Sequence, residues 1–126
     1  MLLPAVSTQT ELIEVIRITA AMRNPLSDAL AGEDTALWEA EQVREVLALI
    51  TELPEGERQR CFLPGWGIRA HSASALLFEV AFCFRCNGAR LWGPAVPGEQ
   101  QGIQSFDPYS TPGRSLLARF RATGQS

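Results

Sequence analysis

The sequence predicts an α+β protein: an antiparallel sheet of about four strands, one long helix packed on a face of that sheet, and a short C-terminal helix. Three observations carry this prediction. A long segment has a helical apolar period, a later segment alternates aromatic with smaller residues, and a Thr-Pro pair precedes a last amphipathic segment. With 126 residues the chain is long enough for one modest core, so residues 1–126 are expected to form a single domain.

The first element lies within residues 10–19. Helix and strand have nearly equal support there, but the β-branched content and the alternation of Ile13 and Val15 with Glu14 favour a strand. The long helix follows from Thr35 to Leu53, with Asp34 as its cap and Pro54 as its stop. Its apolar stripe consists of Ala36, Ala40, Val43, Leu47 and Ile50.

The strand at Leu77–Phe84 has one strongly aromatic face, which the long helix is expected to cover. Glu79 lies on the opposite face and is therefore expected to meet solvent. The aromatic face holds Phe78, Val80, Phe82 and Phe84, and the other face holds Leu77, Glu79, Ala81 and Cys83.

Turn signals bound the neighbouring elements. A turn at 71–74 leads back to a strand around 66–70, and Asn87-Gly88 suits a two-residue type I′ hairpin into Ala89–Trp92. Residues 93–110 are rich in Pro, Gly, Gln and Ser and are expected to be irregular. Thr111-Pro112 then begins the last helix, with Thr as cap and Pro at the first helical position.

Composition excludes several classes of function. The net charge of −3 and the isoelectric point near 5.1 give no electrostatic reason to bind nucleic acid or an anionic membrane. One His, one Tyr and no Lys leave little material for catalytic triads, Schiff bases or P-loops, so the composition favours a non-enzymatic protein. Glu79 and His71 remain as catalytic candidates. The amino-terminal residues lack the pattern of a secretion signal, so a cytoplasmic location is expected.

The three cysteines form the first candidate site. Cys83-Phe-Arg-Cys86 has the spacing of a metal or redox motif, and antiparallel pairing brings Cys61 opposite residues 84–87. A tetrahedral zinc site needs a fourth ligand, and His71 lies too far along the strand to supply it. The alternatives are reduced, buried thiols with Cys61 near Cys86, or a Cys61–Cys86 disulfide in an oxidising compartment.

Tryptophans next to arginines form the second candidate site. Trp38 falls outside the predicted apolar stripe, and Trp66 lies between two glycines, with Arg69 nearby. Exposed Trp together with Arg is typical of protein-interface hot spots, and these three residues are the predicted partner-binding residues. The more common role of such rings is to cover the edge of a core.

Two phrases, Cys61-Phe-Leu-Pro with the following Gly67-Ile-Arg69, and Phe82-Cys-Phe-Arg-Cys86, resemble a family of small uncharacterised bacterial proteins. Members carry a Cys-Phe-x-Pro-x-x-Gly-Ile-Arg strand, then an apolar strand ending in Cys-Phe-x-Cys and a short C-terminal helix. This chain departs from the pattern at Gly65 and Trp66, where relatives have Arg and His or Tyr. The resemblance implies a bacterial source and a strand–helix–three strands–helix order, and it implies no activity.

The leading hypothesis is a non-enzymatic bacterial protein-binding module, in its most concrete form an immunity or antitoxin-type inhibitor of another protein. The alternative is a thiol-based metal-binding or redox protein that uses Cys61, Cys83 and Cys86, with zinc as the candidate metal.

Overall fold

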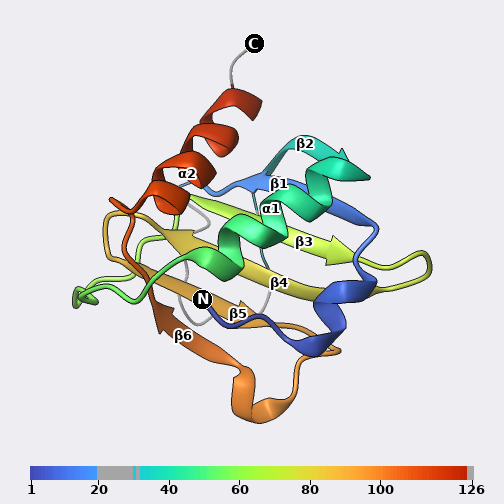
Figure 1. Ribbon diagram of the computed structural model, residues 1–126, viewed down its shortest axis with the longest axis horizontal. Helices are drawn as coiled ribbons and strands as arrows, with labels where there is room; N and C mark the ends of the chain where they lie inside the picture. The colour runs from blue at the N-terminus through green and yellow to red at the C-terminus, as the bar shows by residue number, and fades with distance from the viewer. Residues whose placement is uncertain (20–29, 31, 125–126) are drawn as a thin grey trace.

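The protein is an antiparallel six-stranded sheet with two α-helices on one face, as the computed structural model in Figure 1 shows. The structure describes residues 1–19, 30 and 32–124. The strand order is β2-β1-β3-β4-β5-β6, and every neighbouring pair is antiparallel. The elements are η1 (Ala5–Gln9), β1 (Leu12–Arg17), β2 (Glu33–Glu39), α1 (Glu41–Glu52), β3 (Trp66–His71), β4 (Leu76–Cys83), β5 (Gly88–Trp92), η3 (Gly98–Gln100), β6 (Gly102–Ser105) and α2 (Thr111–Thr123).

The main core lies between the sheet and the two helices. In β4, Phe78, Val80 and Phe82 are fully buried against this core, and Phe84 packs at its margin. The aromatic face predicted from alternation is therefore confirmed, and so is the helix that covers it. From α1, the side chains Val43, Val46 and Ile50 enter the same core.

The predicted helix over residues 35–53 is wrong in its first part. Residues Glu33–Glu39 form β2, an edge strand paired with β1, and α1 begins only at Glu41. Ala40 separates the two elements with a positive φ of 51°. Asp34 lies inside β2 and caps no helix. Pairing with β1 outweighs the local helical period, because it places Trp38 opposite Ile13 on the core face.

The sheet has six strands instead of about four, since β2 and β6 were both missed. The segment 93–110, expected to be irregular, contains the short strand β6. The helix lengths also differ from expectation: α1 has 12 residues, and the C-terminal helix α2 has 13. Ser110, rather than Thr111, caps α2, and its side chain accepts a hydrogen bond from the Gly113 N–H at 3.1 Å.

The hairpin between β4 and β5 is confirmed, but its turn is not the expected two-residue type. Residues 84–87 form the connection, and only Asn87 there has a positive φ, of 54°. This longer turn carries Arg85 and Cys86, and it lies at the end of the sheet next to α2.

The second face of the sheet holds a smaller apolar cluster. Leu30 packs there with Ile16, Ala81 and Trp92. Gly67 allows the close approach, because a Cβ at that position would lie 2.7 Å from a Leu30 methyl and 2.9 Å from a β4 carbonyl oxygen.

A side chain of β6 attaches the amino-terminal segment to the sheet. The Gln104 side chain accepts a hydrogen bond from the Leu2 N–H at 2.8 Å and donates one to the Leu2 carbonyl at 2.7 Å. The Met1 amine donates to the Leu53 carbonyl at 2.5 Å, at the end of α1. Burial lowers the pKa of this amine, and the charge of Glu55 partly offsets that effect.

None of the helices in the described part of the chain is long and apolar enough to cross a membrane.

Candidate functional site

Phe120 of α2 lies between two tryptophan rings. Its ring stacks on Trp38 at a centroid distance of 5.8 Å and on Trp66 at 5.6 Å, with interplanar angles of 13° and 8°. Phe120 is fully buried, Trp38 is only 6% exposed, and Trp66 is half-buried. One ring stack thus joins β2, α2 and β3, and only its Trp66 end reaches the surface.

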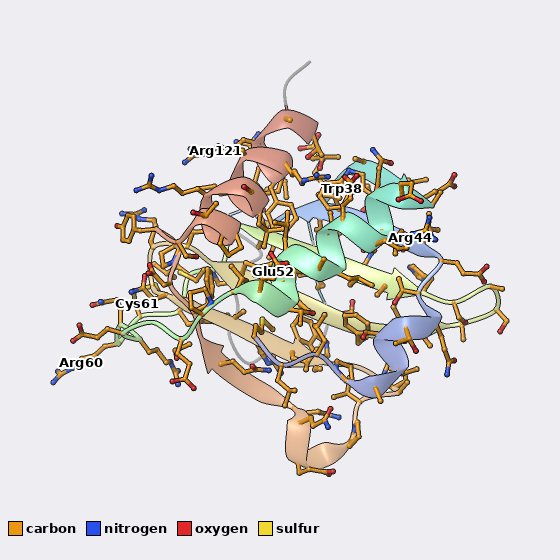
Figure 2. The ribbon with its side chains drawn as sticks, in the orientation of Figure 1. Trp38, Arg44, Glu52, Arg60, Cys61 and Arg121 are labelled. Carbon is orange, nitrogen blue, oxygen red and sulfur yellow. A yellow bond between two sulfur atoms is a disulfide. The ribbon has the colours of Figure 1, made fainter. Side chains whose placement is uncertain are left out.

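The three residues predicted to bind a partner do not share one surface. Trp38 belongs to the core between the helices and the sheet (Figure 2), as expected of a ring that covers a core edge. Arg69 lies on the second face, because residues three apart on a straight strand point to opposite sides. Trp66 lines a surface groove.

That groove lies between α2 and the end of the sheet where β3 begins and β4 ends. Trp66 lines it from β3, and the side chain of Leu63, which is 50% exposed, lines it from the preceding loop. Its cavity volume is about 170 Å³, which is below the range of sites that enclose a drug-sized ligand and leaves room for one or two partner side chains. The residues that line the groove are Leu63, Gly65, Trp66, Phe84, Arg85, Leu117 and Arg121.

Two guanidinium groups accompany this apolar surface. Arg85 comes from the β4–β5 turn and Arg121 from α2, and both are exposed. Neither forms an ion pair with another residue in the described part of the chain. Arg119, by contrast, reaches Glu45 of α1 at 2.8 Å. The groove therefore combines apolar contact area with two positive charges, and no acidic side chain in the described part of the chain pairs with either of them.

A disulfide lies beside the groove. Cys61 and Cys86 are bonded, with their Cα atoms 5.8 Å apart, so the prediction that these two residues lie close together is confirmed. Cys61 is exposed in the loop before β3, and Figure 2 shows it on the same side of the molecule as Arg60 and Arg121. The bond ties the loop that carries Leu63 to the turn that carries Arg85, so it holds two walls of the groove together.

The third cysteine has a different environment. Cys83 is a free thiol, 1% exposed, on the second face of β4. Within the described ranges, no group of three or more His, Cys, Asp or Glu side chains is arranged to hold a metal ion. With Cys61 and Cys86 bonded to each other, the three sulfur atoms do not form a ligand set.

A chain of charged groups crosses the second face of the sheet. Arg69 donates to Glu79 at 3.0 Å and lies 3.7 Å from Glu14, and Glu14 in turn contacts the His71 ring at 2.5 Å. Arg69 also donates to the Leu30 carbonyl. The expectation that Glu79 meets solvent is wrong, since the residue is only 7% exposed.

Pairing with Arg69 explains how the Glu79 carboxylate can be buried. Antiparallel register places Glu14, Arg69 and Glu79 side by side on β1, β3 and β4, so their interactions hold three strands together. Within the described ranges, Glu14 and Arg69 link His71 to Glu79. The arrangement gives each of them a structural partner and brings neither to the groove.

Sequence reasoning missed most residues of the groove. Arg85, Leu63 and Leu117 carry no motif, and they meet only because the disulfide-linked loop, the β4–β5 turn and α2 converge. One signal was present: the segment Thr111–Thr123 contains three arginines and no acidic residue, although the whole chain is acidic.

Comparisons with protein-family models, with curated proteins and with solved structures give no match to this chain.

Proposed function

We propose that this protein is a non-enzymatic protein-binding module and that the groove beside α2 is where it binds its partner. The observation that carries the proposal is the half-buried Trp66, presented with exposed Leu63 and with Arg85 and Arg121 in one groove. Trp and Arg dominate the binding energy of protein interfaces, and they do so in central pockets surrounded by apolar contacts.

The rigidity of the groove supports the same function. Trp66 is backed by the stack on Phe120, and the loop that carries Leu63 is tied by the disulfide to the β4–β5 turn. A partner that binds here therefore does not have to order these two elements, and the entropic cost of association is smaller.

An immunity or antitoxin-type inhibitor is the most concrete form of this proposal. A small acidic protein that binds another protein through a preformed groove fits that role. The resemblance of the Cys61–Arg69 and Cys83–Cys86 phrases to small bacterial proteins is part of the same proposal, and so is a bacterial source. We propose no nucleic-acid or membrane partner, because the net charge of −3 opposes both.

The experiment is a quantitative affinity capture from the organism that encodes the chain, with three baits. Leu63→Ser removes exposed apolar area inside the groove, and Leu37→Ser removes it from β2, where Leu37 is 59% exposed. We expect wild type and Leu37→Ser to retain one stoichiometric protein, and Leu63→Ser to retain about tenfold less of it. If wild type captures no stoichiometric protein, the proposal fails.

A second candidate function is favoured by the disulfide. Cys61 is exposed and bonded to Cys86, so the pair can exchange with an external dithiol, as thiol-based redox proteins do. The proposed location remains the cytoplasm, where thiols are kept reduced and such a bond is transient, so there the disulfide supports the groove only in the oxidised protein and the Trp66–Phe120 stack supports it in both forms. Alkylation of the thiols in intact cells tests the redox function and the cytoplasmic location together. A cytoplasmic redox protein shows Cys61 oxidised under oxidative stress and reduced otherwise. A pair that is oxidised under both conditions excludes the redox function and the cytoplasmic location.

A further inference from the structure

We propose that the groove recognises an acidic segment of a partner protein, with an apolar side chain of that segment packed on Trp66 and its carboxylates bound by Arg85 and Arg121. This inference rests on the proposed function and adds the chemistry of the partner.

The first argument is the charge of the groove. Arg85 and Arg121 have no ion-pair partner in the part of the chain that the structure describes, although they line the same groove. They come from different elements, a turn and a helix, so a ligand that meets both carries negative charge at more than one point. Arg is suited to this task, because its planar fork binds a carboxylate through two parallel hydrogen bonds.

The second argument is the apolar floor between these charges. Leu63, Trp66, Phe84 and Leu117 line the groove together with the two arginines. A phosphate or another small anion leaves such a floor uncovered. A peptide that alternates carboxylate and apolar side chains covers the floor and neutralises both guanidinium groups.

The third argument separates a protein from other polyanions. Nucleic acids and anionic membranes gain affinity from many basic contacts, and the whole chain has a net charge of −3. Two arginines in a short groove favour a local acidic segment, and the overall negative charge disfavours an extended polyanionic surface.

The test is a selection from a phage-displayed library of random peptides, carried out on the intact, oxidised protein. Wild type is compared with the double variant Arg85→Glu/Arg121→Glu and with the control Arg58→Glu/Arg114→Glu. The control makes the same change in net charge at exposed arginines that do not line the groove. Circular dichroism and a thermal melt establish that each variant is folded, and Arg85→Gln/Arg121→Gln replaces the Glu pair if that pair is not.

We expect wild type and the control to select peptides rich in Asp and Glu around an apolar residue, and the groove variant to lose that preference. By fluorescence anisotropy, the selected peptide should bind about tenfold more weakly for each arginine removed, and Leu63→Ser should weaken it by a similar factor. Binding should also weaken as salt rises.

Three results overturn the inference. The first is that wild type selects peptides without acidic enrichment, or none at all. The second is that the selected peptide binds the groove variant as well as wild type. The third is that inorganic phosphate or vesicles containing anionic lipid compete for the two arginines at concentrations where acidic peptides do not bind.

Failure of this inference can be distinguished from failure of the proposed function. If the affinity capture recovers a stoichiometric partner that Arg85→Glu/Arg121→Glu also retains, the protein binds a partner but not through acidic recognition. If acidic peptides bind the groove and the capture recovers no partner, the chemistry holds and the proposed function fails.

Discussion

Removing the Cys61–Cys86 bond should destabilise the protein without changing its fold. Cys61→Ser is the suitable variant, because Cys61 is exposed and a hydroxyl there stays in contact with water. A serine at Cys86, which is 1% exposed, would add the cost of a buried hydroxyl. The wild-type protein in excess dithiothreitol provides a second route to the same state.

The magnitude follows from the length of chain that the bond closes. The two cysteines are 25 residues apart, and the chain-entropy relation gives about 3.5 kcal/mol for a loop of that length at 25 °C. For a chain of 126 residues, with an unfolding entropy near 2.1 cal/mol/K per residue, that loss lowers the melting temperature by about 13 °C.

Urea unfolding followed by circular dichroism measures this loss, with and without dithiothreitol. The matched control is Cys83→Ala, which alters a buried free thiol and leaves the bond intact. We expect the stability of Cys83→Ala to remain sensitive to the reductant, as that of wild type is, and the stability of Cys61→Ser to be insensitive to it. A thiol count on the unreduced, denatured protein should give one thiol, that of Cys83.

Two outcomes would refute this reasoning. A count of three thiols in protein purified without reductant would mean that the bond does not form. If wild type gives one thiol and Cys61→Ser loses less than about 0.5 kcal/mol of unfolding free energy, then closing this loop does not restrict the unfolded chain enough to stabilise the protein.

The remaining predictions concern the core and the second face. Phe120→Ala should cost about 3–5 kcal/mol in urea unfolding and diminish the near-ultraviolet circular dichroism of the stacked tryptophans; an unchanged spectrum would contradict the stack. Arg69→Met should cost about 2–4 kcal/mol because it leaves the buried Glu79 carboxylate without its partner, and the added change Glu79→Leu should recover most of that loss; strictly additive losses would argue against the pair. Gly67→Ala should cost about 1–3 kcal/mol because its methyl would lie 2.7 Å from a packed side chain, whereas Gly98→Ala, with nothing within 4 Å, should change the melting temperature little.

The two-residue alternation of side chains along the strands predicted the fold most reliably. It placed Phe78, Val80 and Phe82 on one face of β4, and these residues are fully buried beneath the helices. Where a strand is paired regularly, as β4 is with β3 from Phe78 to Phe82, backbone geometry fixes which side chains share a face. The same geometry predicted that Cys61 and Cys86 lie close together.

The errors arose where tertiary contacts decide between two local patterns. Residues 35–39 continue the helical period of α1, yet they form part of an edge strand because β1 offers hydrogen bonds and a core position for Trp38. The strand β6 has four residues and begins with a glycine, so its sequence resembles that of a loop. Burial of Glu79 depends on Arg69, which is ten residues away in the chain and directly opposite in the sheet.

The candidate site could be predicted only in part. Trp66 was named from its type and its neighbouring glycines, and the arginines of the last helix suggested either a patch for an acidic partner or a solvated face. Arg85 carries no such signal, and it joins Arg121 in one groove only when the β4–β5 turn and α2 are placed together. Exposure of a ring depends on what packs over it. Sequence alone therefore could not separate Trp38, which lies inside the stack, from Trp66, which lies at its open end.

The two edge strands of the sheet, β2 and β6, bear on whether copies of this protein can pair strand to strand. At one edge, β6 has only four residues, and so short a strand offers few unpaired backbone groups to an incoming strand. At the other edge, exposed Glu33, Asp34 and Glu39 on β2 repel a second copy of the same strand by charge. The short length of β6 does not depend on acidity, but the charge repulsion at β2 disappears as its carboxylates are protonated. Acid-induced fibrils of this protein should therefore grow from β2, and their onset should follow the charge of that strand.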